Sequence, residues 1–111
     1  MKLPPDAIIA TANLTKYLLV WRDADDKSQF LAQAGYGQEN WQQLESALRN
    51  QILPLDAVPS DEPNRFGDVY EIRGILVGLN GVELAIVTIW MIEYATQQTK
   101  FITLYPDKGV K

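Results

Sequence analysis

The sequence contains no cysteine and no histidine among its 111 residues. Disulfide frameworks, zinc sites with thiolate or imidazole ligands, cysteine nucleophiles and histidine-based acid–base mechanisms are therefore excluded. A calcium loop is not indicated either, because the acidic run from Asp23 to Asp26 has no glycine at its sixth position and no glutamate at its twelfth. We expect neither a metal ion nor another cofactor.

Long apolar runs are also missing. The longest apolar-rich stretch, Val82 to Tyr94, is interrupted by Glu83 and Thr88 and is shorter than the roughly 20 residues that span a bilayer. Residues 1–6 have no apolar segment behind the single positive charge of Lys2, so they do not resemble a secretory signal. We expect a soluble, cytoplasmic protein that does not contact a membrane.

Basic residues are outnumbered by acidic ones, 10 to 14, which gives a net charge of −4. Tight non-specific binding to nucleic acid depends on Lys and Arg that neutralise phosphates, so this balance disfavours RNA as a partner without excluding a local basic patch. Apolar residues make up 47% of the chain, as in ordinary globular proteins. We expect a single domain over 1–111, with an ordered core at about 3–106.

The first half of the chain has apolar residues at helical spacing. Three helices are predicted there: a short one around Leu14–Leu18, a second that starts at Asp25 or Asp26 and stops at Gly35, and a third over 38–52. Four apolar residues of the third helix lie on one stripe: Trp41, Leu44, Leu48 and Ile52.

After Pro54 the period shortens to two, which predicts strands at 55–58, 69–77, 82–94 and 100–105. Asn80-Gly81 is the signal of a tight hairpin, and the run 85–92 indicates a central strand covered on both sides. Helices followed by strands predict an α+β fold, with two to three N-terminal helices packed on one face of a three- to four-stranded antiparallel meander sheet.

Three segments occur in a characteristic order: Lys16-Tyr17-Leu18-Leu19, then Lys27 to Leu48 with its Gly35-Tyr36 and Glu39-Asn40-Trp41, then Thr88 to Pro106. From about Leu3 to Pro106 the chain resembles a bacterial domain family of unknown function, found free-standing and at the C-termini of polymorphic-toxin-like proteins. Its element order is also similar to the ribonuclease fold shared by barnase, EndoU, the tRNase colicins and the RelE toxins. That resemblance implies a sheet face that could cradle RNA.

RNA cleavage by the 2′-hydroxyl needs a base, a proton donor for the leaving oxygen and positive charge on the phosphate. Without histidine, these roles fall to other residues on and beside the strands. The catalytic candidates are Arg65, Arg73, Glu93, Thr103 and Tyr105, and the candidates for phosphate contacts are Lys16 and Lys100. The same residues also fit a surface role, as solvated charges and a strand-end tyrosine that packs its ring.

Two functions remain open. The first is a protein-interaction domain without catalysis, which binds a second copy of the chain or another protein, such as a neighbouring immunity-like protein. The acidic charge and the lack of a strong acid–base constellation favour it. The second is a histidine-independent, metal-free ribonuclease of the toxin type, and its only support is the resemblance.

Overall fold

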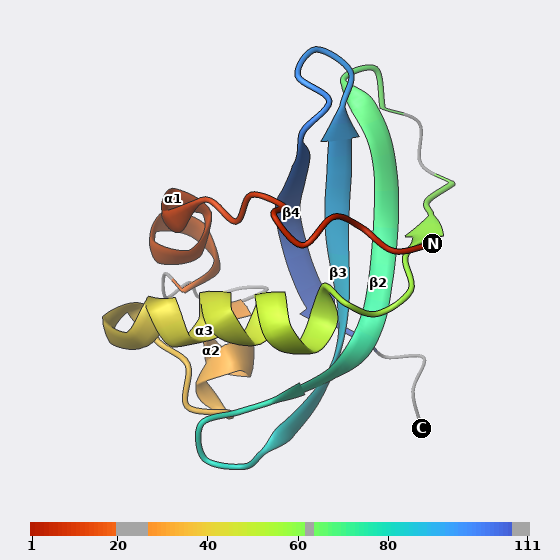
Figure 1. Ribbon diagram of the computed structural model, residues 1–111. Coiled ribbons are helices and arrows are strands. Elements are labelled where there is room, and N and C mark those ends of the chain that lie inside the picture. Colours follow the sequence, from red (N-terminus) through yellow and green to blue (C-terminus); the bar gives the residue numbers. More distant parts are fainter. Residues whose placement is uncertain (20–26, 62–63, 108–111) are drawn as a thin grey trace.

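The structure, a computed structural model, describes residues 1–19, 27–61 and 64–107 (Figure 1). Its helical elements are α1 (Thr11–Asn13), η1 (Leu14–Leu18), α2 (Lys27–Ala32), η2 (Gln38–Asn40), α3 (Trp41–Ala47) and η3 (Leu48–Ile52). Its strands are β1 (Val58–Pro59), β2 (Gly67–Val77), β3 (Glu83–Glu93) and β4 (Thr99–Pro106). The predicted second helix begins in the part of the chain that lies outside the described residues.

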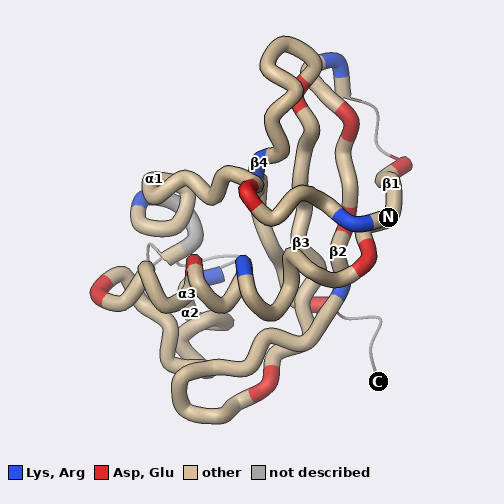
Figure 2. Tube along the Cα trace, viewed as in Figure 1, with Lys and Arg blue, Asp and Glu red and all other residues tan. Residues whose placement is uncertain are grey.

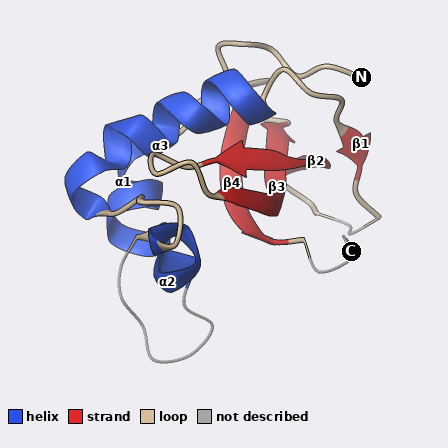
Figure 3. Ribbon diagram, turned by 90° about the horizontal axis from the view of Figure 1, so that it is seen from below, coloured by secondary structure: helices blue, strands red, loops and turns tan. Residues whose placement is uncertain are grey.

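The strands form one antiparallel sheet in the order β1-β2-β3-β4, so each strand pairs with its neighbour in sequence. The helices lie to one side of this sheet, as the views in Figure 1 and Figure 3 both show. The predicted α+β class with an antiparallel meander is therefore confirmed. No helix within the described ranges is long and apolar enough to cross a membrane.

Hydrophobic residues of the third predicted helix explain how the helical layer attaches to the sheet. The segment η2–α3–η3 spans residues 38–52, as predicted, and Leu44, Leu48 and Ile52 of its stripe are fully buried. They meet residues of β2 and β3 that share one sheet face, among them Ile72 and Trp90. Burial of each such side chain contributes about 1.5–3 kcal/mol, so this stripe is the main attachment of the helices.

Two glycines shape the ends of elements. Gly35 follows α2 with φ 90°, and its N–H donates to the Ala32 carbonyl at 3.0 Å, which is the predicted helix end. Gly81 has φ 85° in the connection between β2 and β3, where the Gly78 N–H donates to the Val82 carbonyl at 2.8 Å. The hairpin predicted from Asn80-Gly81 is confirmed.

A β-bulge in β4 decides which of its residues face the helices. Trp90 pairs with Phe101 and Ile89 pairs with Thr103, so one step along β3 corresponds to two steps along β4, and Ile102 is the extra residue. Phe101 and Leu104 are consequently both buried in the core, although they are three residues apart. Thr103 lies on the opposite face of the sheet, beside Ile89.

Candidate functional site

The sheet face that points away from the helices, here called the open face, carries most of the predicted site residues. Leu84, Ile86, Thr88 and Trp90 of β3 are buried on the helix side, so the odd-numbered residues of β3 and their partners lie on the open face. Its cross-strand rows are Val69–Met91–Lys100, Glu71–Ile89–Thr103 and Arg73–Val87–Tyr105.

The prediction that β3 is covered on both sides is correct for one side only. Val87 is 1% exposed, but Ile89 and Met91 on the open face are only half-buried, and the helices lie on the other face (Figure 3). A long apolar run in the sequence therefore marked a strand with a partly uncovered face rather than a strand between two layers.

The open face contains a hollow of about 290 Å³, here called the sheet-face hollow. Its lining residues are Ser60, Asn64, Val69, Glu71, Ile89, Met91, Ile102, Thr103 and Tyr105. The floor consists of half-buried apolar side chains of β2 and β3, and the polar groups stand around it. Glu71 is the only charged group among the described residues that line it.

Arg73 is held by two carboxylates. Its Nη1 donates to Oδ1 of Asp107 at 3.0 Å, and its Nη2 lies 3.5 Å from Oε2 of Glu71. The hydrogen bond to Asp107 is the main reason why the pKa of Arg73 is raised. The guanidinium therefore remains charged, but a substrate phosphate would have to compete with both carboxylates for it.

Glu93 and Lys100 form a separate pair near the turn between β3 and β4. Lys100 Nζ lies 2.9 Å from Oε1 of Glu93, and Thr96 Oγ1 donates to the same oxygen at 2.9 Å. The hydrogen bond from Lys100 is the largest cause of the lowered pKa of Glu93. A lowered pKa suits a structural carboxylate and not a general base tuned toward neutrality.

The predicted catalytic residues thus fall into separate groups. Arg73, Thr103 and Tyr105 lie on two neighbouring rows, whereas Glu93 is six residues along β3 from Val87, or about 20 Å. Arg65 lies on the segment before β2, where its guanidinium is 5.1 Å from the centre of the Phe66 ring. The five candidates do not converge on one point.

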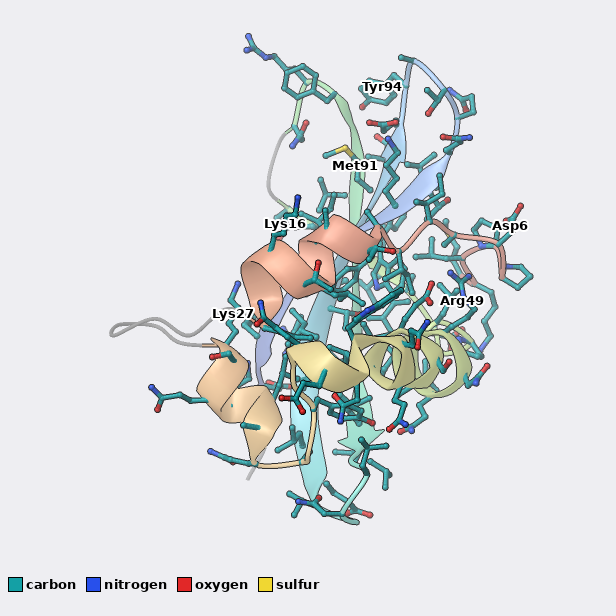
Figure 4. All side chains as sticks on the ribbon, turned by 90° about the vertical axis from the view of Figure 1, so that its left-hand side faces the viewer. Asp6, Lys16, Lys27, Arg49, Met91 and Tyr94 are labelled. Carbon is teal, nitrogen blue, oxygen red and sulfur yellow. The ribbon has the colours of Figure 1, made fainter. Side chains whose placement is uncertain are left out.

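A second hollow, here called the β4-edge hollow, lies between the first helical segment, the start of α2 and β4. Its volume is about 570 Å³, and it is lined by Ala12, Asn13, Lys16, Lys27, Ile102 and Thr103. Figure 4 shows Lys16 and Lys27 projecting on the same side of the molecule. Lys27 Nζ donates to Thr103 Oγ1 at 2.8 Å.

The two hollows meet across β4, because Ile102 and Thr103 line both. The charges differ between them: two lysines line the β4-edge hollow, and a glutamate lines the sheet-face hollow. Elsewhere, basic and acidic residues are interspersed over the trace in Figure 2. Sequence reasoning named Lys16 and Thr103 but not Lys27, Asp107 or Ile102 as site residues, because only the bulge and the strand register bring these together.

Within the described ranges, no three acidic side chains lie close enough together to hold a metal ion. The acidic run Asp23 to Asp26 lies outside the described residues.

Comparison with protein families places residues 3–108 in the family described as "Domain of unknown function (DUF6883)". No curated protein and no solved structure matches the chain. The predicted membership of a domain family of unknown function is confirmed. The match covers residues 3–108, and the prediction covered about Leu3 to Pro106. The chain belongs to the DUF6883 family.

Proposed function

We propose that this member of the DUF6883 family is a protein-interaction domain that binds an arginine or lysine side chain of a partner protein in the sheet-face hollow. The observation that carries the proposal is the position of Glu71. Its carboxylate is the only charged group among the described lining residues, and it stands beside an apolar floor.

The floor and the carboxylate match the two parts of a long basic side chain. Val69, Ile89 and Met91 offer apolar surface to the aliphatic stem, and Glu71 offers acceptor oxygens to the cationic head. A carboxylate has about four acceptor positions, so the contact with Arg73 leaves capacity for a second donor. The volume of about 290 Å³ suits one long side chain.

The charge of the whole chain agrees with this partner chemistry. The net charge of −4 attracts a basic protein surface and repels an acidic one. Arginine is also among the residues that most often dominate binding energy when they enter a pocket at the centre of an interface. The proposed partner therefore presents an arginine or lysine within an otherwise neutral or basic surface.

The test is a titration of isotope-labelled protein with two short capped peptides, followed by NMR. One peptide contains a central arginine, and the other contains citrulline, which has the same shape without the charge. We expect the arginine peptide to shift the signals of Glu71, Ile89 and Met91, and to bind at least about tenfold more tightly than the citrulline peptide, or about 1.4 kcal/mol.

Glu71→Gln should remove the difference between the two peptides, whereas the control Glu83→Gln, at an exposed site at the start of β3, should retain it. Circular dichroism verifies that both variants are folded. Equal binding of the two peptides, or an unchanged difference in Glu71→Gln, would contradict the proposal.

A second candidate function, the histidine-independent ribonuclease, is favoured by one observation: Glu71, Arg73, Thr103 and Tyr105 lie on two neighbouring rows of the open face. In that case Glu71 would be the base for the 2′-hydroxyl, and Tyr105 would be the proton donor. Incubation with tRNA distinguishes the two functions. Cleavage that is lost in Tyr105→Phe would favour the nuclease, and intact tRNA would favour the interaction domain.

A further inference from the structure

The β4-edge hollow differs in charge from the rest of the site and is independent of the proposed Glu71 contact. We infer that Lys16, Lys27 and Thr103 form a binding site for a single phosphomonoester group on a molecule that also carries an aromatic ring. Both lysines and the hydroxyl line one hollow of about 570 Å³, and none of the described residues that line it is acidic.

Asn13 holds the first helical segment in place over β4. Its Nδ2 donates to the carbonyls of Ile102 at 2.8 Å and Phe101 at 3.2 Å. Lys16 lies three residues further along the same helical segment, and both residues line the hollow. The Asn13 anchor therefore keeps Lys16, on the same segment, beside β4 at the hollow.

Lys27 is fixed from the other side of the hollow. Its Nζ donates to Thr103 Oγ1 at 2.8 Å, which holds the ammonium group over the edge of β4. An ammonium group has three donors, and a phosphomonoester dianion has three strong acceptor oxygens. Two ammonium groups can therefore donate to one phosphoryl group beside Thr103, whose hydroxyl accepts from Lys27 and donates to the Leu104 carbonyl at 3.4 Å.

The surroundings favour one phosphoryl group over a chain of phosphates. From the lysines, the surface continues over Ile102, which is 38% exposed, into the sheet-face hollow, where the next charged group is Glu71. A nucleic acid strand needs a series of cations along its path, and here the carboxylate of Glu71 would repel the next phosphate. An aromatic ring next to the phosphoryl group would instead pack on Ile102.

Two sources supply this chemistry: a phosphorylated aromatic side chain and a nucleoside monophosphate. The experiment is an NMR titration at pH 7.5, above the second phosphate pKa of about 6, with four probes. These are phenyl phosphate, adenosine monophosphate, inorganic phosphate and a single-stranded RNA hexanucleotide. We expect phenyl phosphate or adenosine monophosphate to shift the amides of Asn13, Lys16, Ile102 and Thr103, and to bind at least fivefold more tightly than inorganic phosphate.

Three variants test the assignment. Lys16→Ala changes an exposed helical residue and should leave folding intact while it weakens binding at least fivefold. Lys27→Ala should also weaken binding at least fivefold. Lys100→Ala is the matched control, because it also removes one lysine charge, but at the pair with Glu93, which does not line the hollow.

Tighter binding of phenyl phosphate than of the nucleotide identifies a phosphorylated side chain as the source, and the reverse identifies a nucleotide; both support the site. An equal loss of binding in Lys100→Ala and Lys16→Ala would overturn it, because general attraction would then explain the result. Binding of the RNA hexanucleotide tenfold tighter than that of phenyl phosphate and adenosine monophosphate would also overturn the proposed site, because it would identify a surface for polyanions. Binding of the single phosphoryl group uses Lys16 and Lys27 and not the contact of Glu71 with a basic peptide, so the site and the proposed function can fail separately.

Discussion

Replacement of Thr88 by valine tests the polar contact at the centre of the core. Thr88 Oγ1 donates to the Ile72 carbonyl at 2.9 Å and accepts from Trp90 Nε1 at 2.7 Å. All three residues are fully buried. Valine has nearly the same shape as threonine but no hydroxyl, so Thr88→Val leaves the indole N–H without its acceptor and the carbonyl without this donor.

The cost follows from the penalty for a buried polar group that has lost its partner, about 1–3 kcal/mol. We expect Thr88→Val to lower the free energy of unfolding by about 2 kcal/mol. For 111 residues, an unfolding entropy of about 2.1 cal/mol/K per residue converts this loss into a decrease in Tm of about 9 °C. Urea unfolding followed by far-ultraviolet circular dichroism measures the change in the free energy of unfolding.

A double-mutant cycle separates the lost hydrogen bond from a change in packing. In a Trp90→Phe background there is no indole N–H to leave unpaired, so Thr88→Val should cost about 1 kcal/mol less than in the wild type. An equal cost in both backgrounds, or a cost below about 0.5 kcal/mol in the wild type, would refute the reasoning.

Two further predictions concern the packing of the β2–β3 hairpin and the effect of pH. A Cβ atom at Gly78 would fall on the carbonyl oxygen and Cβ of Ala34, so Gly78→Ala should lower the free energy of unfolding in urea by about 1–3 kcal/mol. The control Gly37→Ala, where an added Cβ meets nothing within 4 Å, should change it by less than about 0.5 kcal/mol. Equal urea midpoints for the two variants would contradict the close contact at Gly78. Lys100→Met removes the hydrogen bond that most lowers the pKa of Glu93. A carboxylate whose pKa is lower in the folded than in the unfolded state stabilises the fold at pH values above its unfolded-state pKa, and this stabilisation is lost as the pH falls toward its folded-state pKa. The Tm difference between Lys100→Met and the wild type should therefore be present at pH 7 and shrink below pH 4.5. A Tm difference that does not vary with pH would argue against this pair.

Local pattern was sufficient to predict most of the fold. The stripe Leu44, Leu48 and Ile52 indicated both the extent of the third helix and its buried face, because a helix that buries one side repeats its apolar residues every three to four positions. The strands followed from alternation in the same way. The sequence is ambiguous for β3, because residues 85–92 are nearly all apolar, and such a run does not reveal whether the second face of the strand is covered.

The bulge shows why the site was harder to predict than the fold. Phe101 and Leu104 are both buried, and a spacing of three cannot place both on one face of a regular strand. This signal was present in the sequence, but the intervening Ile102 is also apolar and concealed it. If Phe101, Ile102 and Thr103 ran as a regular strand without the bulge, Thr103 would share the face of Phe101, and neither hollow would have its present lining.

Contacts between distant parts of the chain depend on that register. Lys27 and Thr103 are 76 residues apart in sequence, and Arg73 and Asp107 are 34 apart. Composition shows only that cations and anions are both present; the strand pairing determines that Arg73 meets two carboxylates while Lys16 and Lys27 line a hollow with no described acidic residue. Deletion of Ile102 removes the bulge but leaves Thr103 directly after Phe101, and the regular alternation of the strand then still places Thr103 opposite Ile89. The Lys27–Thr103 pair should therefore persist in this deletion, because it depends on the face that Thr103 occupies and not on the extra residue itself.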